Sequence, residues 1–340
     1  MADKPSRGLI LYGDGLMPFL SPSHSHIHSL ASRASCGFLA LRDPPPTVFM
    51  LLVKEANEEN SLPQESEDDR VIRDLAQLLD VYDIYNIKDD DFINPSVDFL
   101  KQFPVPTISE RFMGMRATLF TNCATTQSFG TKLGFNVKDF DELMKIGSDN
   151  LQSENIPSSL SSAARLLMLL GLEDRKVAET SEYDLVLLHV RRAGTATIKK
   201  ENLNDELEWL NKLVGEITHI AEPGSPIASH LHLSLVLSYG SPLLNGDSSS
   251  LNSLALKEMH PNLSLLRPCQ SYTMKGGRIL NGIRHHHPML VAQWQEAVTR
   301  KDMARLFSFQ EFKEVHASFS SNLYAMGSCD YLASRILWIL

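Results

Sequence analysis

The sequence predicts an α/β protein with three layers, α/β/α, and a mostly parallel central sheet. Two observations carry this prediction: short, continuous apolar runs recur along the chain, and segments with apolar residues at three- and four-residue spacing lie between them. Continuous apolar runs are typical of parallel strands buried on both faces, and the periodic segments are typical of helices that cover such a sheet. The predicted strands are 8–12, 37–41, 48–53, 116–121, 184–190 and 231–238.

In the first half of the chain, GLILY at 8–12 ends at a Gly-Asp-Gly turn, where the glycines permit a sharp change of direction. The segment SPSHSHIHSLASRASCGFLAL at 21–41 predicts a short helix that leads into the second strand. The polar, acidic stretch 54–69 has no apolar period, so we expect a mobile loop. A helix is expected from Arg70, because one face carries Val71, Ile72, Leu75, Leu78, Leu79 and Tyr82.

In the second half, helices are predicted at 135–146 and 158–170. The strand YDLVLLHV at 183–190 and the helix at 203–221 form half of a βαβ unit. We expect this helix to bury one apolar stripe against the sheet, made of Leu203, Leu207, Leu210, Val214, Ile217 and Ala221.

The last part of the chain predicts a hairpin, a turn and a helix. RPCQSYTMKGGRI at 267–279 indicates a strand or hairpin that turns at Gly276-Gly277. The histidines 285–287 are expected in a surface turn before a long helix at about 289–306. We expect residues 1–320 to form a single domain, followed by an apolar C-terminal segment, 321–340, that docks as a helix.

Composition narrows the class of protein. The formal net charge of −9 disfavours nucleic-acid binding, because an acidic chain repels polyanions. The four cysteines are far apart and form no C-x-x-C pair, which indicates reduced thiols in an intracellular protein, and we expect a cytoplasmic one. No apolar run reaches the roughly 18 residues of a membrane span, and the N-terminus is too poor in apolar residues for a signal peptide.

Candidate functional residues follow the strands, because ligands of open parallel sheets gather at the carboxyl ends of the strands. Asp14 follows the first strand and is a candidate metal ligand; the alternative is a turn aspartate that bonds its own backbone. His189 lies near the end of the strand at 184–190, which is followed by Arg191-Arg192 but by no carboxylate. The stretch 122–135 is rich in hydroxyl residues and glycine and can hold an anion through backbone amides, although it lacks the order of a P-loop.

Other histidines give weaker indications of a metal site. His230 and His232 alternate on one strand, so a shared ligand site is geometrically allowed, with core or edge packing as the alternative. His24, His26 and His28 are expected to point in different directions on a helix and to form no ligand face.

The order of these pieces resembles the alkaline-phosphatase-like metalloenzyme superfamily, in particular the archaeal type of cofactor-independent phosphoglycerate mutase. The resemblance rests on GDGL after the first strand, on the segment at 21–41, and on MRATLFTNC, YDLVLLHV and LVLSYGSP. It implies a pair of divalent ions, commonly zinc or manganese, held by Asp and His ligands around a Ser or Thr nucleophile. Asp14 matches the first of these ligands.

The other family ligands are not found. After YDLVLLHV, where the resemblance calls for an Asp and a His, the chain has Ala193 or Gly194 and then Ile198. At LVLSYGSP the Asp-His pair of the family falls on Ser238 and Tyr239, no nucleophile segment is found, and the cap domain is reduced.

From these losses we interpret the chain as a pseudoenzyme: a non-catalytic intracellular binding or scaffold protein with an unknown protein partner, no catalytic residue and no cofactor. The first alternative is a metal-dependent phosphatase or phosphomutase that uses Asp14 with His189, His230 and His232. The second is a phosphate clamp made by Arg191-Arg192 without hydrolysis. If the protein is non-catalytic, we expect Asp14→Asn to change stability only slightly.

Overall fold

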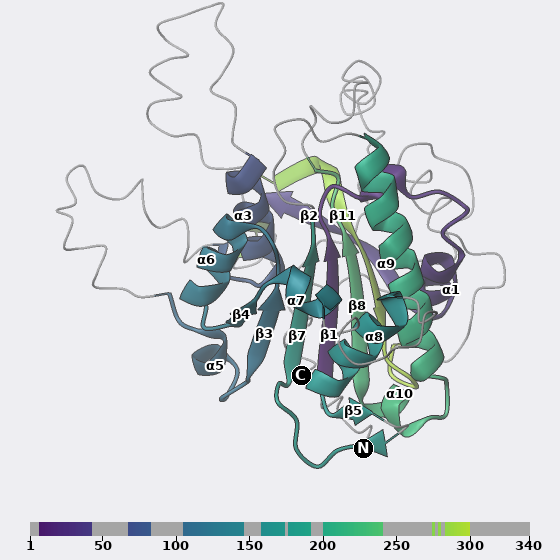
Figure 1. The fold of residues 1–340 in the computed structure, drawn as a ribbon. Helices are drawn as coiled ribbons and strands as arrows, with labels where there is room; N and C mark the ends of the chain where they lie inside the picture. The colour runs from purple at the N-terminus through teal and green to yellow at the C-terminus, as the bar shows by residue number, and fades with distance from the viewer. Residues whose placement is uncertain are drawn as a thin grey trace, which may run out of the picture.

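The computed structural model describes residues 7–42, 67–82, 105–145, 158–173, 176–191, 200–240, 274–275, 278–279 and 283–299. Within these residues one seven-stranded sheet has the order β2-β11-β8-β1-β7-β3-β4 (Figure 1). The strands are β1 (Arg7–Gly13), β2 (Ser35–Arg42), β3 (Ala117–Phe120), β4 (Asn136–Lys138), β7 (Leu185–Val190), β8 (Leu231–Leu237) and β11 (Ile283–Trp294).

The sheet is mostly parallel, as the sequence predicts. β1 lies at its centre and pairs in parallel with β7 and β8, while β3 pairs in parallel with β7 and β4. Only β11 runs antiparallel, against β8 and β2. The predicted strands 184–190 and 231–238 therefore belong to one sheet, which confirms the predicted fold class; the predicted strand 48–53 lies outside the described residues.

Helices cover both faces of the sheet. On one face, α1 (Ser25–Arg33), α8 (Ser158–Leu169) and α9 (Lys200–Ile220) pack against Leu9 and Leu11 of β1. On the other, α3 (Glu67–Leu78), α5 (Ile108–Arg111) and α6 (Ala124–Lys132) pack against Ile10 and Tyr12. The alternation of β1 side chains between two cores is what a strand buried on both faces requires. The short remaining elements are η1 (Met17–Phe19), α7 (Phe140–Lys145), α10 (Pro226–His230), β5 (Leu172–Glu173), β6 (Lys176–Val177), β9 (Met274–Lys275) and β10 (Arg278–Ile279).

Several predicted helices and the hairpin are confirmed. In α9, Leu207, Leu210, Val214 and Ile217 are fully buried in the core, so these members of the predicted stripe pack as expected, while the side chain of Leu203 lies outside what the structure describes. α1 and α8 lie where the sequence places them, and β9 and β10 pair in antiparallel fashion, as the predicted hairpin requires; Gly276-Gly277 between them lie outside the described residues. Within the described residues, no helix combines the length and the apolarity that a membrane span needs.

Other predicted elements are wrong. Over 289–294 the expected helix at 289–306 is replaced by β11, which also contains the histidines 285–287, so these do not form a surface turn; residues 297–299 form a turn after the strand. Its apolar run is buried on both faces: Leu290 contributes to one core and Met289 to the other. A short run of this kind does not distinguish a strand from a helix by periodicity, and pairing with β8 and β2 favours the strand.

The predicted helix at 135–146 begins instead as β4 and continues as α7. Gly134 takes a positive φ of 80°, which ends α6 and returns the chain to the edge of the sheet. The helix predicted from Arg70 begins at Glu67, so the end of the predicted loop 54–69 is helical, while 54–66 lie outside the described residues. The segment 321–340 also lies outside them, and the domain bounds stay a prediction.

Candidate functional site at the carboxyl edge of the sheet

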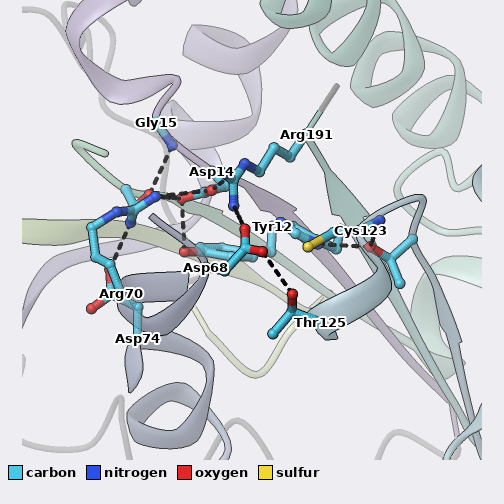
Figure 2. A network of polar contacts seen from close by, with 12 residues as sticks. Tyr12, Asp14, Gly15, Asp68, Arg70, Asp74, Cys123, Thr125 and Arg191 are labelled. Carbon is cyan, nitrogen blue, oxygen red and sulfur yellow. Dashed lines mark hydrogen bonds and ion pairs between the residues drawn. The ribbon is translucent and has the colours of Figure 1, made fainter. Parts of the chain in front are cut away.

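Polar side chains gather where β1, β7, β3 and β8 end. Asp14, Arg191, Thr121 and Ser238 follow these four strands directly. Because the strands are parallel, their carboxyl ends meet at one edge of the sheet, where α/β proteins usually bind ligands. The first turns of α3 lie over this edge and supply charged side chains, Asp68 and Arg70 among them (Figure 2).

Asp14 is the centre of this network and is only 3% exposed. Nη2 of Arg70 donates to both of its carboxylate oxygens, at 2.8 and 3.0 Å. The Ser238 hydroxyl donates to Oδ1 at 2.9 Å, and the Tyr12 hydroxyl lies 3.3 Å from the same oxygen. The side chain is thus bound by groups from α3, β8 and β1, and the alternative role as an isolated turn aspartate does not describe it.

The turn after Asp14 depends on Gly15. This residue has a φ of +73°, which residues with a Cβ rarely adopt. In this conformation its N–H donates to the Ser238 hydroxyl at 2.9 Å, and that hydroxyl in turn donates to Asp14. The glycine therefore fixes the hydroxyl that bonds the carboxylate.

Two arginines connect Asp14 to two further carboxylates, one buried and one half-exposed. On the inner side, Arg70 also donates to Asp74, one helical turn later, at 3.0 Å. On the outer side, Arg191 lies 3.5 Å from Asp14 and 3.5 Å from Asp68. The Thr125 hydroxyl in the first turn of α6 donates to Asp68 at 2.7 Å. The network runs from a buried carboxylate on α3 to a half-exposed one at the start of the same helix (Figure 2).

The arginines determine the charge state of Asp14. Burial alone would raise the pKa of this carboxyl, but nearby positive charge, first that of Arg70, lowers the pKa to about 2. Burial and then the Asp14 charge raise the pKa of Tyr12 well above its ordinary value. Asp14 is therefore an anion and Tyr12 a neutral hydroxyl donor at any physiological pH.

His189 is held as a neutral ring beside this centre. It is fully buried, stacks on Tyr12 with ring centroids 5.3 Å apart, and has its Nδ1 2.9 Å from the Thr121 hydroxyl. Burial lowers its pKa to about 4. The Cys123 N–H donates to the same hydroxyl at 3.1 Å, so Thr121 can donate its own proton to Nδ1 and leave the ring proton on Nε2.

The described residues do not fit the two-ion centre that the resemblance implies. Among them, no group of three or more His, Cys, Asp or Glu side chains could hold a metal ion. Both Asp14 oxygens accept bonds from Arg70, and Ser238 donates to one of them instead of ligating an ion. Burial raises the pKa of Tyr239 to about 12, and residues 193, 194 and 198 lie outside the described residues. Metal ligation by Asp14 stays a prediction, and it would require Arg70 to move away.

The histidines of the alternative phosphatase site do not come together. The sheet register pairs His189 with Tyr12 but His232 with Gly8, so the two residues lie four positions apart along β1, about 13 Å of strand. His232 is buried and bonds Ser234 at 3.1 Å, and His230 lies before β8 with its Nδ1 2.9 Å from the oxygen of Pro226. The ligand set of Asp14 with His189, His230 and His232 is therefore wrong.

The histidines of α1 differ in part from the expectation that all three diverge. The rings of His24 and His28 both lie near the backbone oxygen of Ser21, at 3.1 and 2.9 Å, so these two share one side of the helix. The spacing of four residues explains this, since positions i and i+4 are neighbours on a helix.

Sequence reasoning missed most of the network. The apolar stripe that predicts the helix from Arg70 says nothing about the polar contacts of Arg70 and Asp74. Asp68 falls in the predicted acidic loop 54–69, and the prediction for the stretch that contains Thr125 concerns backbone amides. A signal was present: Arg70 and Asp74 have opposite charges at i, i+4 spacing, which predicts a side-chain ion pair. Nothing in the sequence indicates that this pair would be buried against Asp14.

No family model and no curated protein matches this sequence. Among solved structures, a protein in the alkaline phosphatase superfamily from Vibrio parahaemolyticus is similar, with a TM-score of 0.38 and 10% identity over 89% of this chain. The alignment covers 63% of that chain, so this protein spans less than two thirds of its length. The PH0037 protein from Pyrococcus horikoshii has a TM-score of 0.38 and 13% identity, over 92% of each chain. Both similarities concern the arrangement of strands and helices, and neither transfers a function.

Proposed function

We propose that this protein is a non-catalytic binding protein in which arginine side chains take the place of metal ions at the carboxyl edge of the sheet. One observation carries the proposal: Nη2 of Arg70 lies 2.8 and 3.0 Å from the two oxygens of the buried Asp14. A carboxylate at this position needs a positive partner because it is removed from water. In this protein the positive partner is a side chain of the chain itself, Arg70, and not a bound ion.

The arginine contacts leave little opportunity for a divalent ion. An ion at Asp14 would have to displace a guanidinium that is only 7% exposed and that also bonds Asp74. The displaced cation would then lie close to the bound metal, and like charges at short range in a buried site repel strongly. Without a metal, the hydroxyls of Ser238 and Thr121 keep the weak nucleophilicity of ordinary alcohols.

A cytoplasmic protein partner that contacts the acidic stretch 54–69 or the apolar segment 321–340 is our prediction from the sequence. A retained phosphatase activity has less support, since its histidines lie at opposite ends of the sheet.

The test is elemental analysis of the full-length protein after purification without chelators, paired with hydrolysis of p-nitrophenyl phosphate in added manganese or zinc. We expect substoichiometric metal, no hydrolysis above buffer, and no change in the thermal unfolding midpoint when EDTA is added. Stoichiometric metal in the unmodified protein, or hydrolysis that persists in the exposed-site control Asp205→Asn and disappears in Asp14→Asn, would overturn the proposal.

A further inference from the structure

The outer end of the polar network has different properties from its inner end. Around Asp14 and Arg70 the contacts are 2.8 and 3.0 Å and both side chains are at most 7% exposed. Asp68 is 53% exposed, and its ion pair with Arg191 is 3.5 Å long. A half-exposed ion pair of this length contributes little to stability, whereas the buried pair cannot open without leaving a charge uncompensated. Only the outer contact is suited to exchange.

The surroundings of the Asp68 carboxylate are those of an oxyanion site. Arg191 is 14% exposed and presents a guanidinium, which suits carboxylate and phosphoryl oxygens. The Thr125 hydroxyl donates to the carboxylate at 2.7 Å. Thr125 belongs to the first turn of α6, where the helix dipole favours negative charge, and the N-cap residue Cys123 makes no side-chain cap bond.

We propose that Asp68 is the internal, displaceable occupant of an oxyanion site formed by Arg191 and Thr125, and that a small carboxylate or phosphoryl ligand exchanges with it. The inference rests on the proposed function, because an arginine and not a metal supplies the positive charge. Exchange replaces one oxyanion by another, so Arg191 keeps a negative partner throughout. The released Asp68, already half exposed, enters water at little cost.

The ligand is expected to be small. A net charge of −9 repels extended polyanions at long range, which disfavours nucleic acids and highly acidic peptides. A single carboxylate or phosphoryl group, in contrast, occupies only the position that Asp68 now fills. The site also gives a role to the hydroxyl-rich stretch 122–135, with a side-chain hydroxyl as the identified donor.

The test is titration calorimetry of the full-length protein with inorganic phosphate and, separately, with succinate, at constant ionic strength set by chloride. Asp68→Asn removes the internal occupant and should tighten binding about tenfold if Asp68 holds the site roughly 90% of the time. Asp69→Asn is the matched control: it changes the net charge equally, from the neighbouring exposed position on α3, and should bind like the unmodified protein. Arg191→Lys keeps the charge but loses the guanidinium fork and should bind more weakly than the unmodified protein.

Equal affinities in Asp68→Asn and Asp69→Asn, or undiminished binding in Arg191→Lys, would overturn the exchange. Tighter binding of phosphate or of succinate, with the variants behaving as expected, supports it and identifies the ligand group. Failure here is distinct from failure of the proposed function, because the latter is decided by metal content and hydrolysis in the same preparation. Circular dichroism and the thermal midpoint establish that each variant is folded.

Discussion

Asp14→Asn should destabilise this protein strongly, contrary to the slight effect that the sequence led us to expect. The substitution keeps the shape of the side chain but removes the charge that Arg70 and Arg191 face. Arg70 still pairs with Asp74, but the positive charges of the buried network are then no longer balanced by a carboxylate at position 14. Loss of one partner from a buried ion pair costs about 3–5 kcal/mol.

The pKa of Asp14 gives an independent magnitude. Its fall from 3.8 to about 2 corresponds to about 2 kcal/mol of stability, at about 1.4 kcal/mol per unit. Because the pKa is depressed in the folded protein, this contribution is complete above about pH 4 and is lost as pH falls towards 2. We therefore expect a loss of about 3 kcal/mol at neutral pH. For a chain of 340 residues that corresponds to a fall of about 4 °C in the unfolding midpoint.

The assay is urea and thermal unfolding of the parent and of Asp14→Asn at neutral pH and again near pH 3. Asp205→Asn, an exposed substitution on α9 with the same change of charge, should stay within about 0.5 kcal/mol of the parent. The difference between the parent and Asp14→Asn should shrink in acid. A difference below about 1 kcal/mol at neutral pH, or one that does not depend on pH, would refute a buried ion pair at Asp14.

Three further predictions concern the core. Leu210→Asp should cost roughly 5 kcal/mol of stability and lower the soluble yield, because the side chain of Leu210 is fully buried. The control Lys212→Asp, on the exposed face of α9, should be tolerated. A melting point of Leu210→Asp within about 2 °C of the parent would contradict the packing of α9. Burial lowers the pKa of His232 to about 4, so roughly 3 kcal/mol of stability should be lost as pH falls from 6.5 to 4. In His232→Leu the urea midpoint should depend less on pH over this range. The same pH dependence of the urea midpoint in the parent and in His232→Leu would contradict this prediction. Gly130→Ala should destabilise the protein by about 1 kcal/mol or more, although alanine has the better helix propensity, because the new Cβ would lie 2.5 Å from Cδ2 of Leu119. A higher thermal midpoint in Gly130→Ala than in the parent would show that Leu119 moves away without cost.

The sequence alone determined the elements whose signal is local. The apolar run at 184–190 and the stripe on the helix after it are properties of consecutive residues, and β7 and α9 form where these patterns lie. Alternation of such elements is enough to predict a mostly parallel sheet covered on two faces. The predictions failed where local pattern is ambiguous: the run at 289–294 fits a helix as well as a strand, and only pairing with β8 and β2 made it β11.

The site was decided by tertiary structure. Asp14 was identified from its turn, but its partner Arg70 lies 56 positions further along the chain, and only the packing of α3 over the sheet edge brings the two together. Similarly, the parallel register places His189 beside Tyr12 and His232 beside Gly8, at opposite ends of β1. The periodicity of a sequence indicates which face of a helix or strand is buried. It does not indicate which group neutralises a buried charge, because electrostatic interactions depend on distance in space and so on which elements pack together.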